Sequence, residues 1–132
     1  MSSTNSAAIV VLLTAGSQEE ASRLAEMLVG AHLAACVQIL PQMESVYRWK
    51  GEVHRAPEFL LLAKTTSACF TELEREVRAL HTYDTPEILA LPVTQVSTPY
   101  FEWLTANSFP PLVSRQAAAQ KDMPPQSGLD PQ

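Results

Sequence analysis

The sequence contains little of what several functional classes require. Its 132 residues include two cysteines, Cys36 and Cys69, which do not form a C-x-x-C pair. Neither a disulfide framework nor a zinc knuckle or thioredoxin-type couple is therefore indicated, and both cysteines should be reduced thiols. Only four glycines occur, without a phosphate-binding loop, and no nucleophile elbow, Walker loop or H-E-x-x-H motif is present. We expect a protein that is not an enzyme.

Basic segments and long apolar segments are also lacking. Nine basic against fourteen acidic residues give a net charge of -5, and no Lys/Arg run could neutralise several phosphates. No stretch approaches the roughly 20 apolar residues of a membrane span. The polar start, residues 1–6, has no basic and apolar regions typical of a secretory signal. We expect no nucleic-acid partner, no membrane association and a cytoplasmic location.

Residues 8–30 predict a strand followed by a helix. An unbroken apolar run over residues 8–13 has strand length and contains β-branched side chains. Ser17 and Glu20 have the spacing of a capping box, in which each side chain bonds an unpaired amide at the helix start. Gly30 suits the left-handed position just past the helix end.

Residues 36–65 predict a hairpin of unusual length. The apolar alternation over residues 36–49 is interrupted by Pro41, which has no amide hydrogen for a ladder, so the strand should bend there. Lys50–Gly51 offers a tight turn, after which residues 52–65 return as the second arm. Such a hairpin is too long for its own domain to cover.

The remaining chain predicts a second helix, a strand and a short C-terminal helix. Helical spacing over residues 70–80 follows a cap near Thr66 or Ser67. Residues 88–91 form a further strand, and Thr98–Pro99 provides a capping hydroxyl and an N1 proline for the last helix.

Composition divides the chain into three parts. Residues 1–7 are a polar leader, residues 8–108 carry the periodic elements, and residues 109–132 are rich in Pro and Gln without an apolar period. We expect a flexible leader, one folded domain and a disordered tail.

The order strand, helix, hairpin, helix, strand predicts an α+β, ferredoxin-like β-α-β-β-α-β sandwich with both helices on one face of an antiparallel sheet. The other face stays bare, and the hairpin carries Tyr47, Trp49 and Phe59 beyond the domain. Because monomers seldom expose large apolar patches, these features predict a homo-oligomer. Periodicity does not choose between a trimer and a dimer.

Five segments between residues 9 and 107 resemble the CutA family of divalent-cation tolerance proteins. The Y-x-W-x-G-E motif at residues 47–52 and the H-x-Y-x-x-P-E motif at residues 81–87 are specific in combination. The resemblance implies a trimer held by exchanged hairpin edges, linked to tolerance of copper and other divalent ions, with a fold similar to the PII signalling trimers. The other segments are residues 34–37, 62–66 and 100–104.

A metal site is the first functional hypothesis. Copper takes imidazole nitrogen with thiolate or carboxylate, so His81 with Cys36 or Glu87 from across a subunit boundary is a chemically sensible set for Cu²⁺ or another divalent cation. The alternative is structural: His81 caps the second helix, and Cys36 packs as a small hydrophobe.

A ligand cleft between subunits is the second hypothesis. Tyr47, Trp49 and Tyr83 would line it beside Asp84, and Lys64 and Glu87 would be its polar anchors. A PII-like sensor or scaffold would receive a small anion or a partner protein there. The structural alternative is a set of aromatic interface anchors with a buried Lys–Glu pair.

The resemblance departs at Thr82, where the family often has proline. The loop that follows the second helix is therefore expected to be less stiff here.

Overall fold

The computed structural model describes residues 6–111. Most of the predicted leader and tail, residues 1–5 and 112–132, lies outside them. The elements follow one another along the described chain, with a 3₁₀ turn (Ser67–Cys69) before the second helix. They are β2 (Ala8–Ala15), α1 (Gln18–Gly30), β3 (Cys36–Ile39), β4 (Met43–Trp49), β5 (Glu52–Thr66), α2 (Phe70–Leu80), β6 (Ile88–Pro92) and α3 (Thr98–Asn107).

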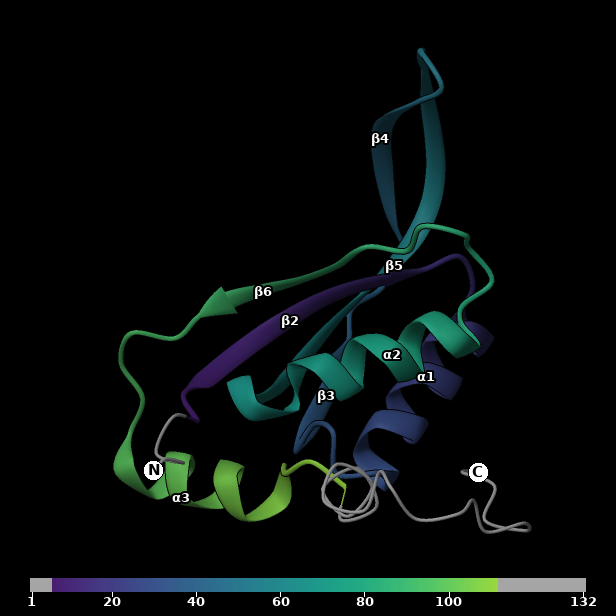
Figure 1. Cartoon of the computed structure of the whole chain (residues 1–132). Coiled ribbons are helices and arrows are strands. Elements are labelled where there is room, and N and C mark those ends of the chain that lie inside the picture. Colours follow the sequence, from purple (N-terminus) through teal and green to yellow (C-terminus); the bar gives the residue numbers. More distant parts are fainter. Residues whose placement is uncertain (1–5, 112–132) are drawn as a thin grey trace, which may run out of the picture.

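The sheet is antiparallel and its strand order is β3-β5-β2-β6, with β4 continuing along β5. Helices α1 and α2 lie on the same side of it (Figure 1). Since β3 and β4 together are the one long strand predicted from the sequence, the order is β-α-β-β-α-β. The ferredoxin-like prediction is confirmed.

The two faces of the sheet differ in what covers them. Alternate residues of β2 and β5, such as Leu13 and Leu61, are fully buried beneath Leu24 and Leu28 of α1 and Leu73 of α2. The residues between them point to the opposite side, which we call the open face. It is a continuous apolar surface, partly or largely exposed in the single chain, made of Val10, Leu12, Leu60, Leu62, Leu89 and Leu91.

The hairpin bends where the sequence predicts it. Residues 40–42 stand opposite residues 59–60 only, so one extra residue is accommodated between the registers of β3 and β4 against β5. The β4–β5 ribbon then projects beyond the sheet (Figure 1). Lys50 and Gly51 both have positive φ, 52° and 83°, as a two-residue I′ turn requires.

Three local predictions need correction at helix ends. Gly30 is the last residue of α1, and the left-handed position belongs to His32, with φ of 62°. The cap of α3 is Ser97, whose hydroxyl accepts the amide of Tyr100, so Thr98 is already helical. A 3₁₀ turn precedes α2, and its N-cap is Thr66 as predicted, but the Thr66 side chain makes no capping bond. Local geometry within one turn decides these positions, and the sequence pattern does not resolve them.

The hydrogen-bonded body extends slightly beyond the predicted domain, residues 8–108. Ala7 exchanges bonds with Ser67, its amide donating to the hydroxyl at 3.0 Å and its carbonyl accepting from the amide at 2.8 Å. At the other end the amide of Phe109 donates to the carbonyl of His32 at 2.9 Å, and the two rings stack at 4.5 Å.

Candidate functional site

An open cleft of about 660 Å³ lies between the β4–β5 hairpin, which lines it from Glu58 at the base to Trp49 near the tip, and the loop that joins α2 to β6. Thr14, at the end of β2, lies between these two walls. The hairpin contributes Ser45, Val46, Tyr47, Trp49 and Glu58, and the loop contributes Tyr83, Asp84, Thr85, Pro86 and Glu87.

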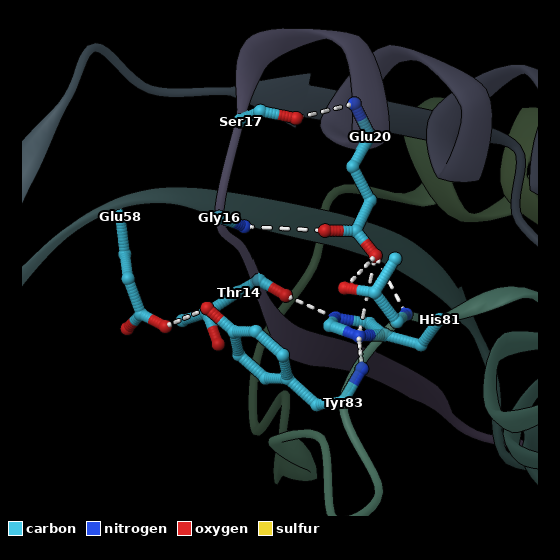
Figure 2. A network of polar contacts seen from close by, with 8 residues as sticks. Thr14, Gly16, Ser17, Glu20, Glu58, His81 and Tyr83 are labelled. Atoms are coloured by element: carbon cyan, nitrogen blue, oxygen red, sulfur yellow. Dashed lines mark hydrogen bonds and ion pairs between the residues drawn. The ribbon is translucent and has the colours of Figure 1, made fainter.

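His81 fixes the start of this loop. It is the C-cap of α2, its amide bonds the carbonyl of Val77 at 2.8 Å, and its side chain is fully buried. Nε2 donates to the carbonyl oxygen of Thr14 at 2.7 Å, and Nδ1 accepts the amide of Tyr83 at 3.0 Å (Figure 2). Both ring nitrogens are therefore engaged, which corresponds to the neutral tautomer with the proton on Nε2.

Glu20 ties the same loop to the start of α1. Ser17 caps the helix as predicted, but the Glu20 carboxylate does not bond Ser17 in return. Oε1 accepts the amide of Gly16 at 3.3 Å, and Oε2 accepts the amide and the hydroxyl of Thr82 at 2.8 and 3.0 Å. Oε2 also lies 3.4 Å from Nδ1 of His81. Thr82 thus provides the loop with two hydrogen-bond donors where proline would provide none.

The electrostatics of Glu20 follow from these bonds. Burial alone would raise the pKa of Glu20, but the two bonds from Thr82 and the bond from Gly16 lower it below its ordinary value of 4.5. The carboxylate therefore stays ionised and holds three donors at neutral pH.

Tyr83 carries the network into the cleft. Its hydroxyl donates to Oε2 of Glu58 at 2.8 Å, and Glu58 is 8% exposed. Burial, followed by this bond and the Glu58 charge, raises the pKa of Tyr83 to about 12. Gly16 favours the arrangement, since a Cβ at this position would lie 3.1 Å from the Tyr83 hydroxyl, closer than ordinary van der Waals contact.

The charged side chains that line the cleft are all acidic. Glu58, Asp84 and Glu87 line it, and no lysine or arginine does so among the described residues. Glu87 is exposed at the rim, yet partial burial of its carboxyl and, second, the Glu58 carboxylate raise its pKa. Negative charge is thus concentrated beside aromatic walls.

The predicted site residues divide into two groups. Five of them, namely Tyr47, Trp49, Tyr83, Asp84 and Glu87, line the one cleft. His81 lies behind it.

Two other predicted residues lie elsewhere. Lys64 pairs with Cys36 on the open face, and Val10 is its partner on the other side, whereas the cleft reaches Thr14 at the opposite end of β2. Within residues 6–111 no three His, Cys, Asp or Glu side chains form a group able to hold a metal ion.

Sequence reasoning did not select Glu20 or Glu58 as site residues. Glu20 was assigned to helix capping, and Glu58 has no motif around it. The signal for Glu58 is its phase: it continues the open-face alternation Leu62, Leu60 as a carboxylate. Where a charged residue occupies a position that the alternation of a strand assigns to an apolar face, it indicates that the face becomes polar there.

These observations define a class of protein: a ferredoxin-like domain with a projecting hairpin and an acidic, aromatic cleft along that hairpin. A family model described as CutA1 divalent ion tolerance protein matches residues 9–107. The chain belongs to this family, as the sequence resemblance predicted.

Individual proteins that are similar to this chain have names of the same family. The chain is 48% identical over 99 residues to the divalent-cation tolerance protein CutA of Thermus thermophilus, covering 75% of this chain and 96% of that protein. The structure of that Thermus protein matches with a TM-score of 0.75 over 76% of this chain and 98% of the other. Protein CutA, chloroplastic, of Arabidopsis thaliana is 46% identical, covering 73% of this chain and 53% of the plant protein.

A third match is the structure of the periplasmic divalent cation tolerance protein CutA of Archaeoglobus fulgidus. It is 38% identical with a TM-score of 0.71, covering 74% of this chain and 94% of the other. No helix in residues 6–111 is long and apolar enough to cross a membrane.

Glu20→Gln tests the network behind the cleft. The amide keeps the shape but replaces an oxygen that accepts hydrogen bonds with a donor, so we expect a loss of about 2 kcal/mol of stability at pH 7. Because the folded-state pKa of Glu20 is lowered, its contribution is present above the ordinary value of 4.5 and is lost as pH falls through the folded value. Denaturant unfolding at matched protein concentration should therefore show the difference between wild type and variant shrinking in acid.

The matched control is Glu19→Gln, which removes the same charge from an exposed position in the same helical turn. It should cost only a few tenths of a kcal/mol. Equal effects of the two variants, or a difference that does not depend on pH, would contradict the role given to Glu20.

Proposed function

We propose that this chain forms a cytoplasmic homotrimer without catalytic activity that binds copper or another divalent cation and takes part in tolerance of metal ions. Its place in the CutA1 family supports the tolerance role. The observation that carries the proposal is the negative cleft, in which Glu58, Asp84 and Glu87 are accompanied by no basic side chain among the described residues. A concentration of one sign of charge between low-dielectric walls raises the local concentration of ions of the opposite sign.

The open face supports the assembly. Leu89 and Leu91 are 43% and 46% exposed, and they continue the apolar surface of β2 and β5 across three strands. At the hairpin, Val53 is 60% exposed and Trp49 46%. Burying both surfaces at once requires neighbouring copies, and closed rings are the common solution for a chain that contacts two different patches.

The metal donors are best assigned from the bonds that each candidate already makes. A copper ion at His81 would have to displace the Thr14 carbonyl or the Tyr83 amide, so His81 acts as a support of the loop in this proposal. Cys36 is a half-buried free thiol on the open face, and Glu87 is exposed at the rim of the cleft. Thiolate and carboxylate from neighbouring subunits would together suit copper.

The charge of the cleft weighs against the second candidate function, a PII-like sensor for a small anion. Lys64, the cation that such an anion would need, lies on the open face beside Cys36. Three carboxylates in the cleft would repel the ligand unless a neighbouring subunit supplied cations.

A cytoplasmic location is the least constrained part of the proposal. Cys36 and Cys69 are free thiols, which supports a reducing compartment. The names of relatives point to different compartments, chloroplastic for the plant protein and periplasmic for the Archaeoglobus protein, so no single location carries over from them.

Light scattering tests the assembly. Wild type at micromolar concentration should have three times the 14.5 kDa mass of the chain. Leu91→Asp places a charge on the open face and should lower the mass, because an unpaired buried charge costs several kcal/mol at each contact. The control is Val29→Asp on α1, where the valine is 42% exposed, close to the 46% of Leu91. A 14.5 kDa wild type, or equal masses for the two variants, would contradict the proposal.

Calorimetric titration with Cu²⁺ tests the donors. Cys36→Ser and Glu87→Gln should each weaken Cu²⁺ affinity by about tenfold or more, as expected for loss of a ligand. Cys69→Ser is the control, since this thiol is buried near the carbonyl of His32 and lies away from the cleft. Unchanged affinity in both Cys36→Ser and Glu87→Gln would rule out this donor set.

A further inference from the structure

The side chains of Glu20, His81 and Tyr83 contact one another behind the cleft, and they change charge at different pH. The pKa of Glu20 lies below its ordinary value of 4.5, and the pKa of Tyr83 is raised to about 12. Glu20 therefore stays ionised and Tyr83 stays neutral near neutral pH. Imidazole ordinarily changes charge between about pH 5 and 8, so His81 is the titrating member of the three in that range.

The His81 ring has two alternative partners at Nδ1. This nitrogen accepts the amide of Tyr83 at 3.0 Å, and Oε2 of Glu20 lies 3.4 Å from it (Figure 2). Neutral imidazole needs a donor at Nδ1, which is the Tyr83 amide, whereas imidazolium carries a hydrogen there and needs an acceptor, which is the Glu20 carboxylate. Nε2 donates to the carbonyl of Thr14 at 2.7 Å in both states. Each protonation state therefore has a complete set of partners.

Glu20 is the charged group in direct contact with the His81 ring, and both side chains are buried, 5% and 0% exposed. β2 presents the uncharged carbonyl of Thr14, and the Glu58 charge on β5 is separated from His81 by the Tyr83 ring. Four charged side chains of α2 and the loop line a hollow beside His81, namely Glu74, Arg75, Arg78 and Asp84. They carry two charges of each sign and are largely exposed, so solvent screens them. Glu20 therefore decides which partner Nδ1 takes.

We propose that His81 is a pH-sensitive switch for the loop between α2 and β6. Neutral His81 holds the Tyr83 amide. A proton taken up from solvent at Nδ1 turns this nitrogen to the Glu20 carboxylate, and the Tyr83 amide loses its acceptor. The Tyr83 hydroxyl then separates from Glu58, and the loop is released from β5.

The switch lies within one chain. Its partners come from α1, β2 and the loop of the same protomer, and most of them are buried beneath the helices. The proposal is therefore independent of the homotrimer and of the copper donors.

NMR of the full chain in EDTA, between about pH 8 and pH 5, tests the switch. Long-range ¹H–¹⁵N spectra should show His81 protonated on Nε2 alone at the upper end and on both nitrogens at the lower end. The Tyr83 amide resonance should move with the same midpoint. Its protection against hydrogen exchange, corrected for the intrinsic rate, should fall about tenfold across the transition, because its acceptor is lost.

His81→Asn keeps the bond and removes the titration. The backbone at residue 81 is extended, with φ of -72° and ψ of 147°, from which an asparagine side chain accepts the amide two residues on. The Tyr83 amide should then stay protected across the whole range. His32→Asn is the matched control and should leave the transition unchanged, since asparagine tolerates the positive φ of 62° at this position.

Glu20→Gln tests the alternative partner. Without the carboxylate the imidazolium loses its counter-charge, so the midpoint of the His81 transition should fall by about one pH unit or more. Glu26→Gln removes the same charge from an exposed position on α1 and should leave the midpoint unchanged.

Four results would overturn the proposal. They are a His81 ring protonated on both nitrogens at about pH 8, a ring that stays neutral down to about pH 5, a Tyr83 amide that does not respond when the ring titrates, and a Tyr83 transition that persists in His81→Asn.

Discussion

The Glu20 carboxylate is the interaction on which the candidate site depends. It is buried where the first turn of α1 meets the end of α2. It accepts hydrogen bonds from Gly16, just before α1, and from Thr82, just after α2. An ionised carboxylate in such a place is stable only because its bonds replace the water that it has lost. His81 adds a second bridge, from the loop to the backbone of β2. Together these residues tie the loop between α2 and β6 to α1 and to β2.

What the network fixes is the direction of Tyr83. Its amide is bound to His81, its hydroxyl reaches Glu58 on the other wall of the cleft, and the bare backbone at Gly16 leaves room for it. Glu20, in the first turn of α1, therefore also orients the loop between α2 and β6. The assembly that we propose would cover the open face and the hairpin, two of the apolar surfaces that are exposed in the described chain.

Much of the fold follows from short-range signals in the sequence. The hairpin could be predicted because Pro41 and Gly51 act locally: one has no donor for the ladder, and the other adopts positive φ at the turn. The separation of the two cleft walls by 25 residues, from Glu58 to Tyr83, is beyond such signals. Only the register of β5 against β2 decides that Glu58 lies near the loop while Lys64 lies at the far end of the sheet. The family motifs did identify the aromatic residues of the cleft, since Tyr47, Trp49 and Tyr83 belong to them.

The role of His81 also could not be predicted from the sequence alone. A histidine at a helix end beside acidic residues indicates a metal ligand or a cap equally well, and only the partners of its two nitrogens separate these interpretations. We infer that this buried network holds the loop of residues 81–87 as firmly as the sheet holds its strands. Native-state amide hydrogen exchange of Thr82 and Tyr83 tests it most directly, because both amides are donors in the network. We predict that these amides exchange as slowly as those of β2 and β5. Exchange at the rate of an open loop would contradict it.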